Sequence, residues 1–418
     1  IIAATILFVR LDPYKMASGV YRQGKFLLPE VNKLIYHEDG KTATISVVFN
    51  KREKALSIRT NGKSDASIMM DPSIGTPSDE ATMILSGAIP MGINPYAKNA
   101  AVIGLGSGLT SHTLLSNSLL ERVDTIEIEE KIVEGAKKFG SRVELVFKDP
   151  RSNIYIDDAK TFFSTYNKKY DIIVSEPSNP WVSGVAGLFS EEFYHLVKRH
   201  LSENGLLVQW LQLYEIDLDL VASVLKAVSL SFSDFVIYAP TNSDILIVAK
   251  GNGPVPNVEP GLFDAPETLR LLRSVYVNGI QDIEARKIAD KTSMSRFLDT
   301  FSIDANSDYY PVLDQNAARS RFLQINVRDI LTLSGAPLPI TEMLAKSIPS
   351  WDNTEVTPAP FFSKIQAIFL AMAVRDYSLY GSFNERYRDI PTEIRQNAEI
   401  LRRFFYDCGF LTRSKRKE

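Results

Sequence analysis

The chain has 418 residues, of which 45% are hydrophobic and 23% are charged, as in a folded protein rather than a disordered one. Its length predicts two or three domains, and a net charge of −3 gives no electrostatic reason to bind nucleic acid. The single cysteine excludes an intramolecular disulfide and a cysteine-rich zinc site. The four histidines show no metal-ligand spacing, so we expect no metal.

The chain begins with a largely apolar stretch of nine residues, IIAATILFV, which basic residues soon follow. Nine residues cannot cross a bilayer, which needs about 20. One interpretation is a core strand. The other is the end of a transmembrane helix whose remainder lies upstream, and the basic residues then place the following chain on the cytoplasmic side.

Residues 30–70 alternate between apolar and polar, with turn dipeptides at Asp39-Gly40 and Asn61-Gly62. This pattern predicts a small antiparallel β unit. A loop at 71–78 and a helix at 79–89 are expected to follow it.

From about residue 98 to 250 the pattern changes to alternating strands and helices, which predicts an α/β domain with a mainly parallel sheet covered on both faces. The expected strands are 100–103, 122–128, 143–146 or 153–156, 170–174, 206–210, 234–238 and 245–249. A linker rich in glycine and proline follows at 250–261. We expect residues 264–330 to be mostly helical with a loop at 306–322, and two amphipathic helices to occur beyond residue 331.

The sequence GLGSG at 104–108 separates a predicted strand from a predicted helix. Glycines let the backbone approach a ligand closely. About 20 residues later the next strand ends in Glu127 and Glu129, where nucleotide-binding sheets place a carboxylate on ribose hydroxyls. Acids also follow the next two strands, at Asp157-Asp158 and Glu176. Together these positions indicate an adenosine-containing ligand.

The segments GLGSG, IEIEE, DDAKTFF and YDIIVSEPSNPW resemble, in this order, those of the spermidine synthases (polyamine aminopropyltransferases), and the resemblance covers residues 30–250. More narrowly, the phrases SGVYR, SEPSNPW and QWLQLY are similar to bacterial spermidine-synthase-like proteins whose catalytic domain follows membrane helices. The resemblance implies a Rossmann-like S-adenosylmethionine-dependent transferase fold with a small N-terminal antiparallel β domain and a helical C-terminal extension. It also implies a bacterial inner-membrane protein with a cytoplasmic catalytic domain, and a homodimer by analogy.

The domain boundaries expected on this basis are the end of a transmembrane helix plus linker at 1–29, the β domain at 30–92, the catalytic domain at 93–250, a linker with a helical extension at 251–330, and a C-terminal helical region at 331–418. The co-substrate implied is S-adenosylmethionine or its decarboxylated form. The implied partner is a small-molecule amine acceptor.

The resemblance also assigns site residues, which are named here by their implied roles. Glu176 and Asn179 are catalytic; Gly104, Gly106, Ser107, Gly108, Glu127, Asp158 and Asp65 bind the cofactor, with Glu127 on the ribose, Asp158 on the adenine and Asp65 near the thioether; Trp181, Gln209 and Tyr214 bind the acceptor. The chain departs from the synthases at three places. Ser107 and Asn179 stand where they have aspartates, and apolar or small residues around Thr82-Met83-Ile84 replace their Tyr-His-Glu cluster.

These departures matter for the chemistry. A sulfonium donor needs neither acid nor metal, but a protonated amine acceptor must lose a proton before it attacks carbon. Glu176 can take that proton, whereas an asparagine cannot ionise and can only orient the amine. We therefore expect transfer of an aminopropyl or other alkyl group to an amine. A methyltransferase and a membrane-tethered nucleoside or polyamine sensor without turnover remain alternatives.

Overall fold

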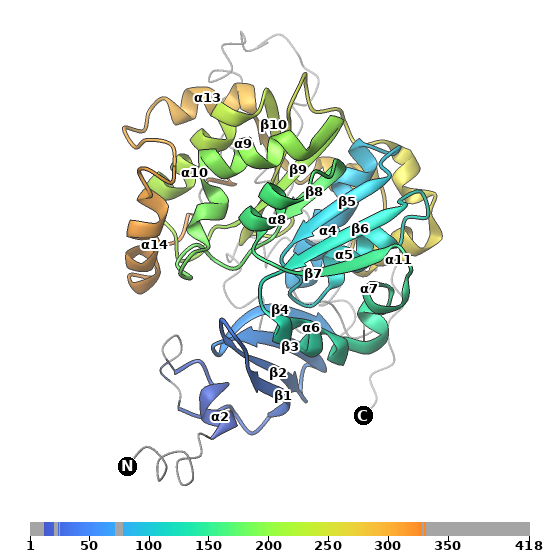
Figure 1. Cartoon of the computed structure of the whole chain (residues 1–418), viewed down its shortest axis with the longest axis vertical. Helices are drawn as coiled ribbons and strands as arrows, with labels where there is room; N and C mark the ends of the chain where they lie inside the picture. Colours follow the sequence, from blue (N-terminus) through green and yellow to red (C-terminus); the bar gives the residue numbers. More distant parts are fainter. Residues whose placement is uncertain (1–11, 21–23, 25, 72–77, 328–329, 332–418) are drawn as a thin grey trace, which may run out of the picture. The chain divides into compact units, whose positions relative to one another are not determined.

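The computed structural model describes residues 12–20, 24, 26–71, 78–327 and 330–331 (Figure 1). The predicted C-terminal helices and the apolar segment 1–9 lie outside these residues, so both stay predictions. The chain divides after Ile330, and the following paragraphs concern the part before this division.

The predicted β unit is confirmed as a four-stranded antiparallel sheet in chain order, which a short helix, α2 (Pro13–Met16), precedes. Its strands are β1 (Asn32–Asp39), β2 (Thr44–Asn50), β3 (Ala55–Thr60) and β4 (Lys63–Met69). The two predicted turns join β1 to β2 and β3 to β4. The inner face carries Ile45, Val47 and Ile58, which are fully buried.

The main sheet of the described chain has eight strands in the order β12-β10-β11-β9-β8-β5-β6-β7. Its strands are β5 (Asn99–Ile103), β6 (Arg122–Glu127), β7 (Ser152–Ile156), β8 (Tyr170–Ser175), β9 (Leu201–Gln212), β10 (Asp234–Tyr238), β11 (Asp244–Lys250) and β12 (Lys287–Asp290). The five strands from β7 to β9 are parallel, whereas β11, β10 and β12 pair antiparallel. The expected Rossmann-like fold with a mainly parallel sheet is therefore present, and antiparallel strands extend the sheet on one side.

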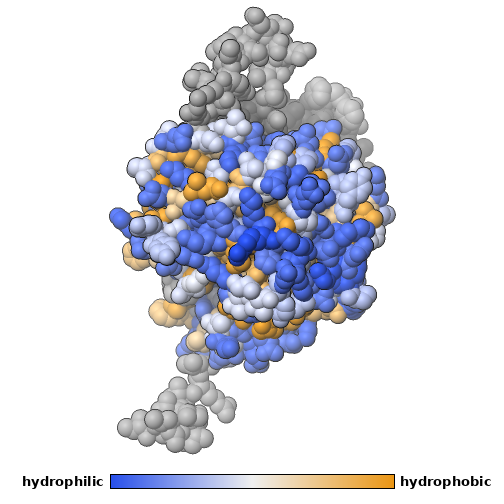
Figure 2. Space-filling model, turned by 45° about the horizontal axis from the view of Figure 1, so that its top comes forward, coloured by the Kyte–Doolittle hydropathy of each residue, from blue (hydrophilic) through white to orange (hydrophobic). Residues whose placement is uncertain are grey.

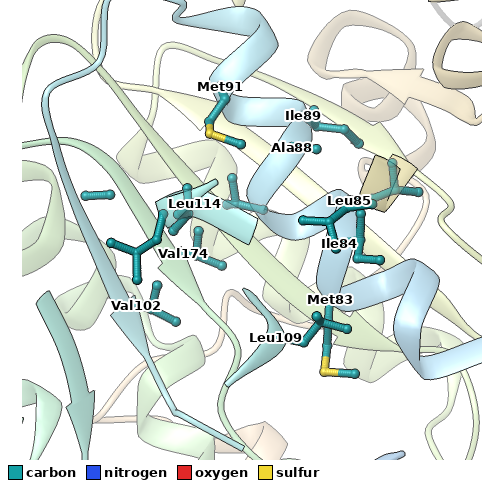
Figure 3. Close-up of a cluster of buried hydrophobic side chains, with 14 of the residues drawn as sticks. Met83, Ile84, Leu85, Ala88, Ile89, Met91, Val102, Leu109, Leu114 and Val174 are labelled. Carbon is teal, nitrogen blue, oxygen red and sulfur yellow. The ribbon is translucent and has the colours of Figure 1, made fainter. Parts of the chain in front are cut away.

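Two layers of helices cover this sheet (Figure 1). On one face α4 (Ser78–Ile93) packs against α5 (Leu109–Leu115), and its side chains meet those of Val102 and Val174 in the sheet (Figure 3). Strand alternation points Ala101 and Ile173 to the opposite face. The other helices are α6 (Glu130–Ala136), η2 (Lys137–Val143), α7 (Leu145–Lys148), α8 (Ala159–Thr165), η3 (Ala186–Phe189), α9 (Glu191–His200), α10 (Leu218–Ser231), η4 (Pro260–Phe263), α11 (Pro266–Ser274), α12 (Ile280–Glu284), α13 (Lys291–Leu298) and α14 (Val312–Phe322).

The structure decides one open alternative and differs from the expected local structure at two further places. Residues 143–146 lie in η2 and α7, where Val143 and Val146 are buried at a helical spacing of three, so the alternative strand 153–156 is the correct one. The segment 264–330 contains the strand β12, which extends the main sheet beyond residue 250. The expected loop at 306–322 is a helix from residue 312 onward.

A buried carboxylate, Glu129, ties the small sheet to α6. Its Oε2 accepts hydrogen bonds from the backbone N–H and the hydroxyl of Thr42, both at 2.7 Å, and from Ala43 N at 3.3 Å. Its Oε1 accepts from Lys131 N at 3.0 Å. Burial alone would raise the pKa of Glu129, but these hydrogen bonds bring it below its usual value. Gly40 makes this close approach feasible, because a Cβ there would lie 2.1 Å from Oε1.

A buried ion pair, Glu80 with Arg142, makes a second link. Glu80 Oε2 contacts Arg142 Nη2, and Glu80 Oε1 accepts from the backbone N–H of Met69 at the end of β4. Burial raises the pKa of Glu80, while the Arg142 guanidinium acts to lower it. The small sheet, α4 and η2 are therefore held together by charge as well as by a shared hydrophobic core.

The surface in Figure 2 is mostly hydrophilic, with hydrophobic residues in small separate patches. Within the described ranges, no helix combines the length and the hydrophobicity needed to cross a bilayer.

Candidate active site

The predicted motifs meet at one edge of the main sheet. Ile103, the last residue of β5, is paired in register with Ile126 of β6 and Ser175 of β8. Because these strands are parallel, the residues that follow them, Gly104, Glu127 and Glu176, leave the sheet in one row. Asp157 continues this row, since Glu127 is paired with Ile156.

The glycine loop packs directly against the Glu176 backbone. Gly104 has a φ of +90°, and a Cβ there would lie 2.5 Å from the carbonyl oxygen of Glu176. The N–H of Glu176 in turn donates to Ile103 O at 3.0 Å. Gly106 and Gly108 also have positive φ values, of +51° and +92°. The loop predicted to hold a cofactor is thus built onto the segment predicted to do the chemistry.

Glu127 is fixed beneath the glycine loop and is 7% exposed. Its two carboxylate oxygens accept from the backbone N–H groups of Leu105, at 2.9 Å, and Glu129, at 3.0 Å. Burial raises its pKa, although these hydrogen bonds oppose the shift. Its role at the ribose stays a prediction, and its position beside the glycine loop is compatible with that role. Glu129, with which it forms the IEIEE pattern, has a different task at the Thr42 backbone.

Asp158 is exposed and its carboxylate accepts from Thr161 N at 2.9 Å, which makes it the N-cap of α8. Its predicted role at the adenine therefore competes with a structural one. Asp157, which sequence analysis named beside Asp158 but did not place on the adenine, is less exposed, and its N–H donates to Glu127 O at 3.0 Å. The structure adds Asp157 as an alternative for the same role.

Glu176 has the properties of a base near neutral pH. Desolvation by the surrounding protein raises its pKa to about 7, opposed by a hydrogen bond of 2.5 Å that Thr110 Oγ1 donates to Oε2. The negative charges of Asp244 and Asp79 act in the same direction as desolvation. At pH 7 such a carboxyl group is divided between its acid and base forms.

Asn179 is fully buried, and its Nδ2 donates to the hydroxyl of Tyr214 at 3.2 Å. Its Oδ1 is buried without a hydrogen-bond partner among the described residues. The Tyr214 ring meets the Trp181 ring edge-on at 6.2 Å between centroids. Arg321 of α14 places its guanidinium 5.7 Å from the Trp181 centroid. The predicted residues of this group are therefore together, and Arg321 joins them from a segment expected to be a loop.

Gln209 lies fully buried in β9 beside the end of β8. Its Nε2 donates to Trp210 O at 3.0 Å and to Ser175 O at 3.3 Å, and its Oε1 has no partner within the described chain. Gln212, three residues further, is also buried and neither of its amide atoms has one there. Sequence analysis missed Gln212, although it stands in the same QWLQ motif.

Ser107 and Asp65 complete the predicted set. Ser107 is fully buried, and its hydroxyl lies 3.1 Å from the sulfur of Met83. Asp65 Oδ1 accepts from Lys63 Nζ at 2.6 Å and from Ser178 Oγ at 3.0 Å. Lys63 was not predicted, although two residues of spacing in a strand put it on the same face as Asp65. Over the residues that the structure describes, His, Cys, Asp and Glu side chains form no group able to hold a metal ion.

Known proteins similar to this chain include several named as polyamine aminopropyltransferases or spermidine synthases. Residues 82–248 match the family described as the spermine/spermidine synthase domain. A polyamine aminopropyltransferase of Clostridium botulinum (strain Eklund 17B / Type B) is 37% identical over 120 residues, which are 29% of this chain and 42% of the relative. That of Methanocaldococcus jannaschii is 31% identical over 138 residues, 33% of this chain and 47% of the relative. The chain thus spans less than half the length of these curated relatives.

Solved structures to which the chain is similar include a probable spermidine synthase from Corynebacterium glutamicum ATCC 13032, with a TM-score of 0.47 and 15% identity over 65% of this chain and 96% of that one. A spermidine synthase from Thermotoga maritima has a TM-score of 0.43 and 18% identity over 53% of this chain and 73% of that one.

Proposed function

We propose that this chain transfers an aminopropyl group from decarboxylated S-adenosylmethionine to an amine acceptor. Its residues 82–248 match the spermine/spermidine synthase domain. The observation that carries this proposal is the position of Glu176. Its carboxyl group has a pKa of about 7 and its backbone packs against the glycine loop at Gly104.

The donor fits the polar groups of this edge. Backbone N–H groups of Leu105, Glu129 and Ile128 hydrogen-bond the Glu127 carboxylate. A carboxylate has about four lone-pair sites, so one remains for a ribose hydroxyl. The glycine loop has no side chains to keep a nucleoside away from the backbone. Asp157 or Asp158 then supplies an acceptor for the adenine amino group at the next strand end.

The reaction needs one proton transfer. The acceptor ammonium gives a proton to Glu176, and its nitrogen lone pair forms a bond to the aminopropyl carbon beside the sulfonium. The carbon–sulfur bond breaks, its electron pair stays on sulfur, and neutral methylthioadenosine leaves. A positioned base of this kind contributes about 10²–10⁴-fold to the rate.

Two carboxamide side chains, Asn179 and Gln209, can bind the amine substrate. Asn179 Oδ1 and Gln209 Oε1 are buried oxygens without hydrogen-bond partners in the described structure, and an amine N–H can donate to either. Because Asn179 Nδ2 donates to the Tyr214 hydroxyl, Asn179 Oδ1 is the atom that remains for the amine substrate. Asn179 thus orients the nitrogen while Glu176 removes the proton.

Methyl transfer from S-adenosylmethionine is a second candidate, which two observations favour. Ser107 puts no charge into the glycine loop, and Lys63 brings a buried cation to the site, where it can attract the carboxylate of the intact donor. The two candidates differ in donor and in product.

Calorimetry with decarboxylated S-adenosylmethionine, S-adenosylmethionine and methylthioadenosine ranks the donors. Mass spectrometry after incubation with putrescine or a mixture of amines then shows whether the product gains an aminopropyl or a methyl group. We expect the aminopropyl product. Tight binding of the intact donor alone, with a methylated product, would replace the first proposal by the second.

The base role has its own test. Glu176→Gln should reduce turnover by about 10²–10⁴-fold, whereas the exposed Glu203→Gln should leave it unchanged. Normal turnover by the Glu176 variant would remove this residue from the mechanism.

We also propose, on the resemblance alone, that the intact protein is anchored in a bacterial inner membrane with this part in the cytoplasm, and that it forms a homodimer. Cell fractionation and light scattering of the full-length protein test these two points.

A further inference from the structure

The carboxylate of Asp65 is only half satisfied. Its Oδ1 accepts from the Lys63 ammonium and from the Ser178 hydroxyl, at 2.6 and 3.0 Å. Its Oδ2 is buried and has no hydrogen-bond partner in the described part of the chain. The Asp65 side chain is 12% exposed and that of Lys63 is 5% exposed. A buried carboxylate oxygen without a donor is costly, so this atom is a ready acceptor for a cationic group.

Asp65 lies near both the glycine loop and the segment from Glu176 to Asn179. Its neighbour in β4, Ala66, has its Cβ 3.9 Å from the position a Cβ would take at Gly106, so β4 passes beside the glycine loop. The charge of Asp65 contributes to the raised pKa of Glu127. Ser178, which donates to Asp65, lies between Glu176 and Asn179 in the chain.

The other acids and the polar loop residue of the site have different partners. Glu127 accepts backbone N–H groups on both oxygens, and Glu176 is needed with a free lone pair for the acceptor proton. Ser107, in the glycine loop itself, is uncharged and its hydroxyl is directed at the Met83 sulfur. A donor with a terminal ammonium therefore finds its carboxylate on β4 and not in the loop.

We propose that Asp65 Oδ2 binds the terminal ammonium of the donor's aminopropyl group, with the Ser178 hydroxyl holding the carboxylate in place through Oδ1. This inference rests on the proposed function, since it requires an aminopropyl donor. It makes Asp65 the residue by which the protein distinguishes the donor from its product, methylthioadenosine, which lacks the aminopropyl ammonium.

Calorimetry tests this without turnover, through the ratio of the dissociation constants of methylthioadenosine and decarboxylated S-adenosylmethionine. Asp65→Asn should lower the ratio by about 10- to 100-fold, the effect of losing a hydrogen bond between charged groups. Methylthioadenosine binding should persist, which also shows that the variant is folded. Asp314→Asn, an exposed substitution of the same type in α14, should leave the ratio unchanged.

Lys63→Met gives a second test of opposite sign. It removes the cation that competes for Asp65, so the ratio should rise. An unchanged ratio in either site variant, with both nucleosides bound by the unaltered protein, overturns the role of Asp65 and leaves the proposed function standing. If the unaltered protein binds neither nucleoside, the proposed function fails and this inference fails with it.

Discussion

At the scale of single residues, the protonation of Glu176 is set by two opposing influences. Desolvation raises its pKa to about 7, and the Thr110 hydroxyl stabilises the charged form. Below pH 7 the group is protonated and cannot accept a proton, so kcat/KM should rise with pH through a limb centred near 7. In Glu176→Gln this limb should vanish along with most of the activity. A pH–rate profile measures both, and a limb that persists in the variant would falsify the assignment.

Thr110 offers a finer test at the same residue. Thr110→Val keeps the shape of the side chain but removes a hydrogen bond to a charged group, worth about 1.5–3 kcal/mol. The limb should therefore move to higher pH by about 1–2 units. Thr113→Val is the matched control. The Thr113 hydroxyl, one turn beyond Thr110 in α5, donates to Leu109 O, and its loss should leave the limb in place.

At the scale of elements, the contact between Gly40 and Glu129 sets how the β1–β2 turn sits on α6. Gly40→Ala places a Cβ 2.1 Å from a carboxylate oxygen held by several hydrogen bonds, so either the turn or the carboxylate must move. We expect a loss of about 1–3 kcal/mol in the free energy of unfolding. Gly261→Ala, which meets only an ordinary contact of 3.7 Å, should be nearly neutral.

A double-mutant cycle separates this contact from a general intolerance of the turn. In a Glu129→Ala background, Gly40→Ala should cost little more, because the group that it displaces is gone. Additive losses in denaturant unfolding would contradict the proposed clash.

The Glu80–Arg142 pair predicts a loss of stability that depends on pH. Arg142→Met leaves a buried carboxylate without its cation, which costs about 3–5 kcal/mol when the carboxylate is charged. Burial already raises the pKa of Glu80, and loss of the guanidinium raises it further. The variant therefore retains stability at acidic pH and loses it as pH rises through that pKa. Thermal unfolding from pH 5 to 8 measures this, and a loss independent of pH would speak for packing alone.

The elements differ in how far the sequence predicts them. The parallel strands and the β unit were found because their apolar runs end at clear turn or glycine signals. Strand β12 has four residues and no such signal. Helix α14 was missed because Pro311, Asp314 and Asn316 are residue types common in loops. In addition, few of its positions are buried, namely Leu313, Ala317 and Ser320.

At the scale of the whole molecule, α14 adds a residue to a site more than a hundred positions earlier in the chain. Arg321→Ala should remove the cation–π contact between the guanidinium and the Trp181 ring. We expect the KM for the amine acceptor to rise by about 3- to 10-fold, as for loss of a cation–π contact. The dissociation constant of methylthioadenosine should not change. Arg319→Ala, an exposed position two residues earlier in α14, is the control, and an equal effect on both ligands would indicate damage to the fold.

Contacts of this range also limit what the sequence alone can predict about the site. The acids at strand ends were predictable, because parallel strands bring their carboxyl ends to one edge. That Glu127 faces the glycine loop while Glu129 faces Thr42 was not, since the hydrogen bonds that decide it span 22 and 87 positions. The pairing of Asp65 with Ser178 likewise joins two sheets.

The close approach of Gly104 to the Glu176 carbonyl has a consequence for any attempt to redesign this protein. A side chain at Gly104, introduced to exclude one nucleoside or admit another, would push on the backbone of the base itself. Under the proposed function, selectivity for the donor and proton transfer from the acceptor therefore depend on the same backbone contact. An engineer who wants to alter the first without the second has to work from the β4 side, where the polar contacts come from side chains.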